Sequence, residues 1–127
     1  LRAGELGCAE SYFNIANAYY NGDGVGRNMK KSKHYSELAA MGGYAKARHN
    51  LGCMENAAGN MDRAVKHYII AARAGYDNSL EAIKECYMNG HATKDDFEKA
   101  LRSHKEAKDE MKSDQRETAA AFLAADR

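Results

Sequence analysis

The feature that most constrains the fold of this chain is an internal repeat. Three short segments resemble one another, and each ends in glycine: RAGELG (2–7), LAAMGG (38–43) and IAARAG (70–75). Their alanines Ala3, Ala39 and Ala71 are 36 and 32 residues apart, and Ala107 follows 36 residues later. The second copy is shorter because its central loop lacks four residues. Registers that agree over three copies predict a repeat protein.

Each copy divides into two segments with helical periodicity. We expect the residues spaced i, i+4, i+5 and i+8 to face inward. In the first half of copy one these are Ser11, Ile15, Ala16 and Tyr19. In the second half of copy two, Val65, Tyr68, Ile69 and Ala72 share one face through the spacing i, i+3, i+4 and i+7. The chain contains no proline, which would break helices, and much of its 44% hydrophobic content is alanine. The sequence therefore predicts closely packed helix pairs that are stabilised by their neighbours.

Several glycines have structural interpretations. Gly43 and Gly75 suit left-handed C-terminal caps. Gly52 lies inside a helical segment, where glycine costs about 1 kcal/mol relative to alanine, so we expect a neighbouring element to approach it closely. The loop NGDGVGRN (21–28) follows a helical segment and lacks the spacing of a phosphate-binding or calcium-binding loop. We interpret it as a connecting turn in which glycine supplies positive φ.

Charge and potential ligands exclude several classes of function. Lys plus Arg number 19 and Asp plus Glu 18, which argues against nucleic-acid or membrane-surface binding. Three separated cysteines and five histidines form no metal-binding or catalytic motif. We therefore expect no catalytic, cofactor-binding or metal-binding residues. Free thiols and the lack of an apolar membrane-spanning run favour the cytoplasm, although a targeting segment could precede Leu1.

The motif A-x-x-x-x-x-[LI]-[GA]-x-x-Y-x-x-G-x-G-V, followed by K-A-x-x-x-Y-x-x-A-A-x-x-G, resembles the Sel-one-like repeat, a branch of the tetratricopeptide superfamily. Copy one matches it best, at Ala9, Ile15, Ala16, Tyr19, Gly22, Gly24, Val25, Lys31, Tyr35, Ala39, Ala40 and Gly43. The resemblance extends over roughly residues 1–108. It implies an all-α solenoid of about three antiparallel helix pairs. It also implies a non-enzymatic scaffold or adaptor. One cysteine per copy departs from the disulfide-rich secreted branch, so no lactamase-like activity is implied.

The resemblance also implies where a partner would bind. In tetratricopeptide-like solenoids the first helix of each repeat lines a concave groove. The outward positions of those helices are therefore the candidate partner-binding residues, and they offer aromatic rings and amides suited to a peptide. They are Glu10, Phe13, Asn17, Tyr20, Asn21, Lys46, His49, Cys53, Asn56, Asn78, Glu81, Glu85 and Met88. An ordinary solvated face is the alternative for this set.

The repeats divide the single domain along its length. We expect the end of a preceding repeat at 1–7 and repeats at 8–43, 44–75 and 76–111. The segment 112–127 leaves the pattern. Asp114 and Glu117 resemble a capping box that opens a short helix, and Ala121, Phe122 and Leu123 could then cover the last repeat. A mobile tail is the alternative.

The expected function is a protein-interaction scaffold that binds a protein or peptide of unknown identity. One alternative is a small-ligand-binding or hydrolase-type protein on the same fold, which a pocket with a buried polar triad would favour. Another is a structural segment of a longer repeat array. Framework residues of a repeat do not identify the partner.

Overall fold

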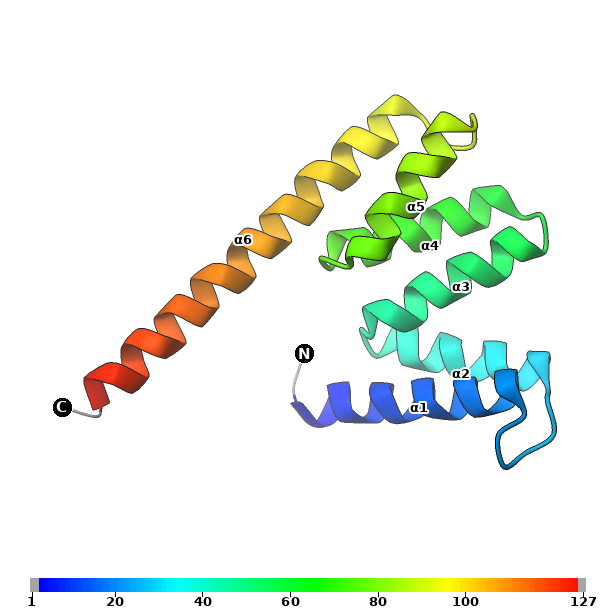
Figure 1. Cartoon of the computed structure of the whole chain (residues 1–127), viewed down its shortest axis with the longest axis horizontal. Coiled ribbons are helices and arrows are strands. Elements are labelled where there is room, and N and C mark those ends of the chain that lie inside the picture. Colours follow the sequence, from blue (N-terminus) through cyan, green and yellow to red (C-terminus); the bar gives the residue numbers. More distant parts are fainter. Residues whose placement is uncertain (1–2, 126–127) are drawn as a thin grey trace.

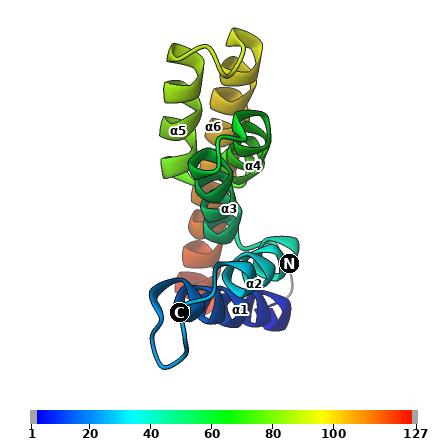
Figure 2. The same cartoon turned by 90° about the vertical axis from the view of Figure 1, so that its right-hand side faces the viewer.

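The computed structural model describes the backbone of residues 3–125 and the side chains of residues 7–125. That part of the chain forms helices and no strands: α1 Ala3–Asn21, α2 Met29–Met41, α3 Ala45–Ala57, α4 Met61–Arg73, α5 Asp77–Met88 and α6 Lys94–Ala125. Consecutive helices pack as antiparallel pairs that stack in chain order (Figure 1, Figure 2). The predicted all-α solenoid of helix pairs is confirmed.

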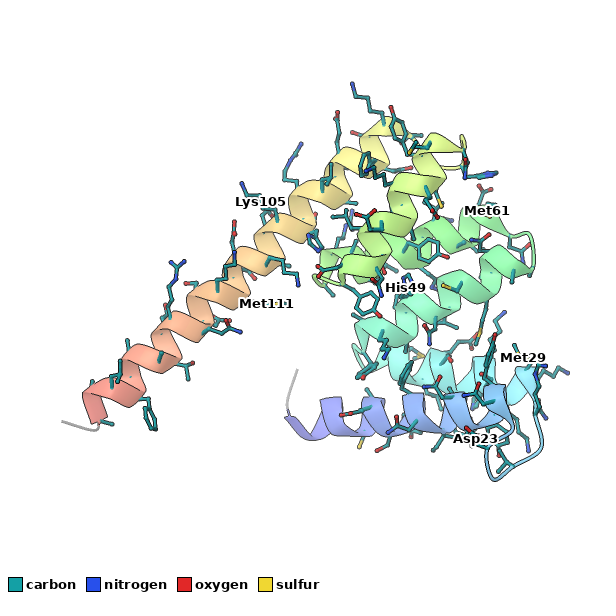
Figure 3. All side chains as sticks on the ribbon, viewed as in Figure 1. Asp23, Met29, His49, Met61, Lys105 and Met111 are labelled. Atoms are coloured by element: carbon teal, nitrogen blue, oxygen red, sulfur yellow. The ribbon has the colours of Figure 1, made fainter. Side chains whose placement is uncertain are left out.

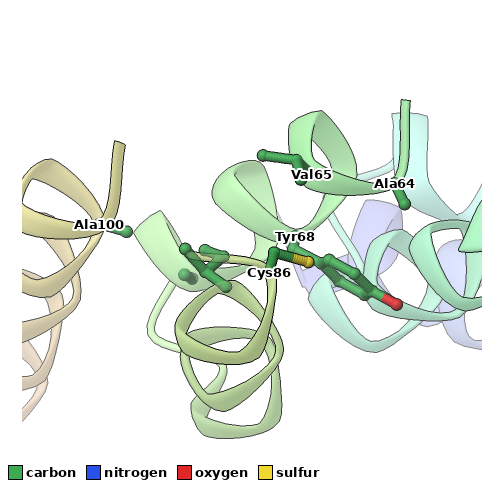
Figure 4. Packing of buried hydrophobic residues seen from close by; sticks show 7 residues of the cluster. Ala64, Val65, Tyr68, Cys86 and Ala100 are labelled. Atoms are coloured by element: carbon green, nitrogen blue, oxygen red, sulfur yellow. The ribbon is translucent and has the colours of Figure 1, made fainter. Parts of the chain in front are cut away.

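The buried side chains gather in two clusters along the stack. The first contains Phe13, Ala39, Ala40, Ala47 and Leu51 and joins α1, α2 and α3. The second contains Ala64, Val65, Tyr68, Ala72, Ile83, Cys86 and Ala100 and joins α4, α5 and α6 (Figure 4). Half of these residues are alanine, so the helices pack with short side chains between them. Each cluster includes residues from two successive repeats, so no helix pair has a core of its own.

Glycines with positive φ follow the ends of helices and shape the loop after α1. Gly43 and Gly75 adopt φ of 87° and 90°, which confirms the predicted left-handed caps. In the loop after α1, Gly22 and Gly24 adopt φ of 75° and 74°. The loop ends at Asn28, whose side chain accepts a hydrogen bond from the Lys31 backbone N–H at 3.0 Å and caps α2. The predicted connecting turn is confirmed.

The prediction for the inward face of the first helix is wrong in part. Ser11 is exposed and Ile15 is 39% exposed, whereas Phe13 is only 4% exposed. The Phe13 ring packs on Tyr44, with ring centroids 5.0 Å apart. The buried stripe of α1 is therefore Ala9, Phe13 and Ala16, spaced i, i+4 and i+7. Apolar and aromatic residues occur on nearly every side of this helix, so periodicity alone did not identify the stripe.

The first helix also begins earlier than we expected. The sequence predicts that residues 1–7 form the end of a preceding repeat, with Gly7 as its last residue. Instead α1 runs from Ala3 through Gly7 to Asn21. Glycine permits a left-handed cap without enforcing one, so the helix can continue through it. Residues 1 and 2 lie outside the described part.

The C-terminal segment does not form a capping helix of its own. Residues 112–125 continue α6, which is 32 residues long. Phe122 is 73% exposed and Leu123 is 64% exposed, so neither covers the last repeat. In Figure 1 this half of α6 extends away from the helix pairs. Asp114 and Glu117 lie in the interior of α6, so they do not form the predicted capping box at the start of a helix. Residues 126 and 127 lie outside the described part.

Candidate partner-binding groove

A groove of about 510 Å³ lies where α1, α2 and α3 meet, and we call it the α1–α3 groove. It is lined by Asn17, Tyr20 and Asn21 of α1, by Met29, Ser32 and Ser36 of α2, and by Asn50, Cys53, Met54 and Ala57 of α3. Met29, at the start of α2, and His49, one residue before Asn50 on α3, are labelled in Figure 3. The first two helix pairs therefore share one concave site.

Small residues of α2 make room for this groove. Ser32 is 1% exposed and Ser36 is 2% exposed, and they lie one helical turn apart. Their short side chains leave space between α1 and α3 that larger residues would fill. Ser32 aligns with Ala64 and Ala100 of the other copies, so a small residue recurs at this position of each repeat.

The lining combines hydrogen-bonding amides with adaptable apolar groups. The amides of Asn17, Asn21 and Asn50 can each donate and accept, as a peptide backbone requires. Tyr20 is 46% exposed and Met29 is 43% exposed. A tyrosine ring offers a large contact area with a polar end, and methionine fits irregular surfaces because its side chain is flexible. This chemistry suits an extended segment of polypeptide.

Only some of the predicted partner-binding residues line the groove. They are Asn17, Tyr20, Asn21 and Cys53. Phe13 belongs to the core and is removed from the set. Lys46 Nζ lies 5.5 Å from the centroid of the Phe13 ring, outside the groove. The other exposed members are Glu10 and Asn56, together with Asn78, Glu81, Glu85 and Met88 on α5.

Several lining residues were not predicted. Met29, Ser32 and Ser36 belong to a second helix, whereas the resemblance placed the groove on first helices only. Asn50 could have been singled out from the sequence, because it aligns with Asn14 at the same position of the first copy. Nothing in the repeat pattern marks Met54 or Ala57.

His49 lies on α3 beside the groove and contacts the next repeat. Its Nδ1 atom is 2.8 Å from Ser79 Oγ of α5. Its ring packs against the rings of Tyr68 and Tyr76, with centroids 5.2 Å away in both cases. Burial lowers the pKa of His49 below its ordinary 6.5, because the charged imidazolium loses hydration. The ring is therefore neutral near pH 7.

A buried carboxylate ties α2 to α3 near the same groove. Glu55 is 5% exposed, accepts a hydrogen bond from Asn60 Nδ2 at 2.9 Å and pairs with Lys33 Nζ at 3.1 Å. The hydrogen bonds from Asn60 and Lys33 lower the pKa of Glu55. Glu55 thus holds its negative charge where two repeats join.

The described part of the chain shows no cluster suited to a metal ion and no membrane-spanning helix. Among residues 3–125, no group of three or more His, Cys, Asp or Glu residues could hold a metal. None of the described helices is long and apolar enough to cross a bilayer.

Comparison with known families agrees with this architecture. The Sel1 repeat model matches residues 9–44, 45–76 and 82–102, which together are well over half of the chain. No curated protein and no solved structure gives a significant match. Sel1 repeats are generally protein-interaction modules. The chain belongs to the Sel1 repeat family.

Proposed function

We propose that this protein is a non-enzymatic scaffold that binds an extended segment of a partner protein in the α1–α3 groove. The observation that carries the proposal is the lining of that groove, which combines three asparagines with two buried serines and flexible apolar side chains. The asparagine amides would bond the backbone of the bound segment. Tyr20, Met29 and Met54 would contact its side chains.

The size of the groove alone does not select a protein partner. A volume of about 510 Å³ also falls within the range of small-molecule sites. Membership in a family of protein-interaction modules favours a polypeptide. The balanced charge of the chain supports a neutral or mixed-charge segment over nucleic acid. Free cysteines favour the cytoplasm as the compartment in which the partner is met.

The exposed predicted residues of α5 form a second part of the proposed surface. Asn78, Glu81, Glu85 and Met88 are all exposed, and Met88 is 73% exposed. They lie outside the groove, so they would contact the partner beyond its anchored segment. Rim contacts of this kind usually contribute less to affinity than residues of a central pocket.

The test compares two variants of the chain in capture experiments from source-cell lysate. The groove variant carries Tyr20→Ala and Asn50→Ala, and the control variant carries Glu85→Ala and Met88→Ala on α5. Circular dichroism verifies that both keep the helical content of the parent. We expect one captured protein to fall at least about tenfold with the groove variant, because two central contacts are lost. The same protein should be retained by the α5 variant.

Three results would count against the proposal. A partner lost only with the α5 variant would place the interface on α5. Retention by both folded variants would place it elsewhere on the stack. Capture of no protein by the parent chain would favour a structural segment of a longer array.

A further inference from the structure

We infer that Cys53 is a modification site that forms a mixed disulfide with small-molecule disulfides, with His49 as the base that accepts the thiol proton. The inference does not depend on partner binding. It rests on a cluster of side chains around Cys53 and on the position of the thiol in the α1–α3 groove.

The cluster has the arrangement of an activated nucleophile. Cys53 Sγ lies 3.5 Å from His49 Nε2, one helical turn earlier on α3. The other ring nitrogen, Nδ1, lies 2.8 Å from Oγ of Ser79, whose side chain is fully buried on α5. In the tautomer in which Nδ1–H donates to Ser79, Nε2 is free to accept the proton of the thiol. Nucleophile, base and orienting group thus form one chain of contacts.

The protonation states of His49 and Tyr68 are compatible with the same assignment. Burial lowers the pKa of His49, which keeps the imidazole neutral near pH 7 and its Nε2 lone pair available, and also makes it a weaker base than a free histidine. The hydroxyl of Tyr68 donates to Cys53 Sγ at 3.6 Å. Burial raises the pKa of Tyr68, so this hydroxyl keeps its proton and can stabilise a thiolate.

The groove gives a reagent access to the sulfur. Cys53 is exposed and lines the groove, beside Asn50, Met54 and Ala57. The other two thiols provide a contrast. Cys8 is exposed like Cys53 but does not line the groove. Cys86 is 4% exposed in the second core cluster, beside the Tyr68 ring (Figure 4).

The position of Cys53 in the middle of a helix selects thiol–disulfide exchange over acyl transfer. In acyl transfer, hydrogen-bond donors must bind an oxyanion beside the nucleophile, and the backbone N–H groups around residue 53 supply none because they bond within α3 (Ala45–Ala57). Displacement at sulfur needs only a thiolate and an accessible disulfide. The cluster therefore supports a modification site and does not revive the hydrolase alternative.

The proposed step is balanced. Cys53 transfers its proton to His49 Nε2, and the thiolate attacks one sulfur of the small disulfide RSSR. The R–S–S–R bond breaks as the Cys53–S–S–R bond forms. The departing RS⁻ takes the proton from His49 and leaves as RSH. The Cys53 sulfur is oxidised and the departing sulfur is reduced, so no other reagent is required.

The test uses oxidised glutathione as the probe and compares the three cysteines within one molecule. After acid quenching and trypsin digestion, Cys8, Cys53 and Cys86 fall in separate fragments, 3–27, 49–63 and 85–94. Mass spectrometry then gives the rate at which each thiol is modified. We expect Cys53 to react about tenfold or more faster than Cys8, and Cys86 to remain protected.

His49→Gln should lower the Cys53 rate to that of Cys8 without changing the Cys8 rate. If His49→Gln unfolds the chain, Cys86 becomes reactive and reports it. Ser79→Ala then tests the inference, because it keeps His49 as the base but removes the Ser79 hydroxyl that orients its ring. It should reduce the ratio of the Cys53 rate to the Cys8 rate while Cys86 stays protected. A Cys53 rate no higher than that of Cys8 in the parent, or a ratio unchanged in a folded variant, would overturn the inference.

Discussion

The aromatic ring of Tyr68 lies directly against the backbone of Gly52. A Cβ atom at position 52 would be 2.5 Å from Cε1 of the ring and 2.7 Å from Cδ1. Tyr68 belongs to the second core cluster, and Gly52 follows Leu51 of the first. The contact between α3 and α4 therefore joins the two clusters, and the missing side chain of Gly52 makes it possible.

Gly52→Ala is expected to lower the free energy of unfolding by about 1–3 kcal/mol, because the added methyl group would overpack the site against a ring that is 2% exposed. Alanine would by itself stabilise a helix by about 1 kcal/mol relative to glycine, so the clash must exceed this gain. Urea denaturation followed by circular dichroism measures the difference.

Gly7→Ala is the matched control. Gly7 also lies within a helix, but no atom of the described residues beyond its own helical neighbours is within 4 Å of the position that its Cβ would occupy. This substitution should stabilise the chain by up to about 1 kcal/mol. If Gly52→Ala stabilised the chain equally, the ring could not lie where the structure places it.

The close approach at Gly52 was predictable because a glycine inside a helix lowers stability unless a neighbouring group packs where its Cβ would lie. The same attention to glycine identified Gly43 and Gly75, which end helices at the same place in successive copies. Such positions are governed by backbone conformation and by the space available for Cβ. Both constraints act on a single residue and select glycine there, so they can be recognised in the sequence.

Other features depended on long-range packing and were not predictable. Phe13 is buried by α2 and by the next repeat, where Ala47, Leu51 and Tyr44 pack around it. The actual capping box of the last helix pairs Thr93 with Asp96: the Asp96 N–H donates to Thr93 Oγ1 at 3.0 Å, and the Thr93 N–H donates to Asp96 Oδ2 at 3.3 Å. The similar spacing at Asp114 lies inside the same helix, so the pattern alone could not distinguish a helix start from a helix interior.

The candidate groove was predicted only on the side of α1 and at Cys53. The contribution of α2 depends on how deeply Ser32 and Ser36 are buried, which follows from the angle between helices and not from the spacing of residues. A repeat motif gives the framework of each helix pair, whereas the depth of a groove is set by several pairs together.

The free energy of unfolding is expected to fall as the pH is lowered from about 7.5 to 5, partly through His67. Burial and the nearby Arg48 guanidinium lower the pKa of His67 below its ordinary 6.5, as burial does for His49. The unfolded chain then binds protons that the folded chain does not. The stabilisation is complete above pH 6.5 and is lost as the pH falls through the folded-state pKa.

Urea denaturation at both pH values measures this dependence. His67→Gln removes one titrating group and should give a smaller loss between the two pH values than the parent chain shows. His91→Gln is the control, because His91 is exposed. A loss in His67→Gln as large as that in the parent would assign the pH dependence to other groups.

Asp77→Asn is expected to loosen the attachment of α6 to the start of α5. One oxygen of Asp77, Oδ1, is 2.8 Å from His104 Nε2 and 3.2 Å from Lys108 Nζ. Hydrogen bonds from His104 and Lys108 lower the pKa of Asp77, so the contribution of this carboxylate is present above its unfolded-state pKa and is lost as the pH falls through the lowered value.

Hydrogen–deuterium exchange measures the effect of Asp77→Asn. Backbone amides of residues 100–111 should exchange faster near pH 7 in the variant than in the parent. Asp95→Asn is the control, since Asp95 pairs with Lys99 within α6 itself, at 2.9 Å. Equal exchange in the parent and in Asp77→Asn would show that the apolar contacts of α6 hold it without the carboxylate.

Removal of residues 112–127 is expected to change the free energy of unfolding by no more than about 0.5 kcal/mol. The contacts of α6 reach Met111, whose Cε would be 3.0 Å from a Cβ at Gly75. Every side chain from 112 to 125 is exposed. A helical extension of this length gains little stability without packing.

The control for this truncation is a shorter chain that ends at Ser103. It lacks His104, Ala107 and Met111, which contact Asp77 or approach Gly75, and it should unfold at clearly lower urea concentration. The two truncations thus separate the packed half of α6 from its exposed half. The removal of 112–127 alone could instead destabilise the chain as strongly. The C-terminal segment would then cover the last repeat as a cap, and the exposure of the α6 residues beyond Met111 would be wrong.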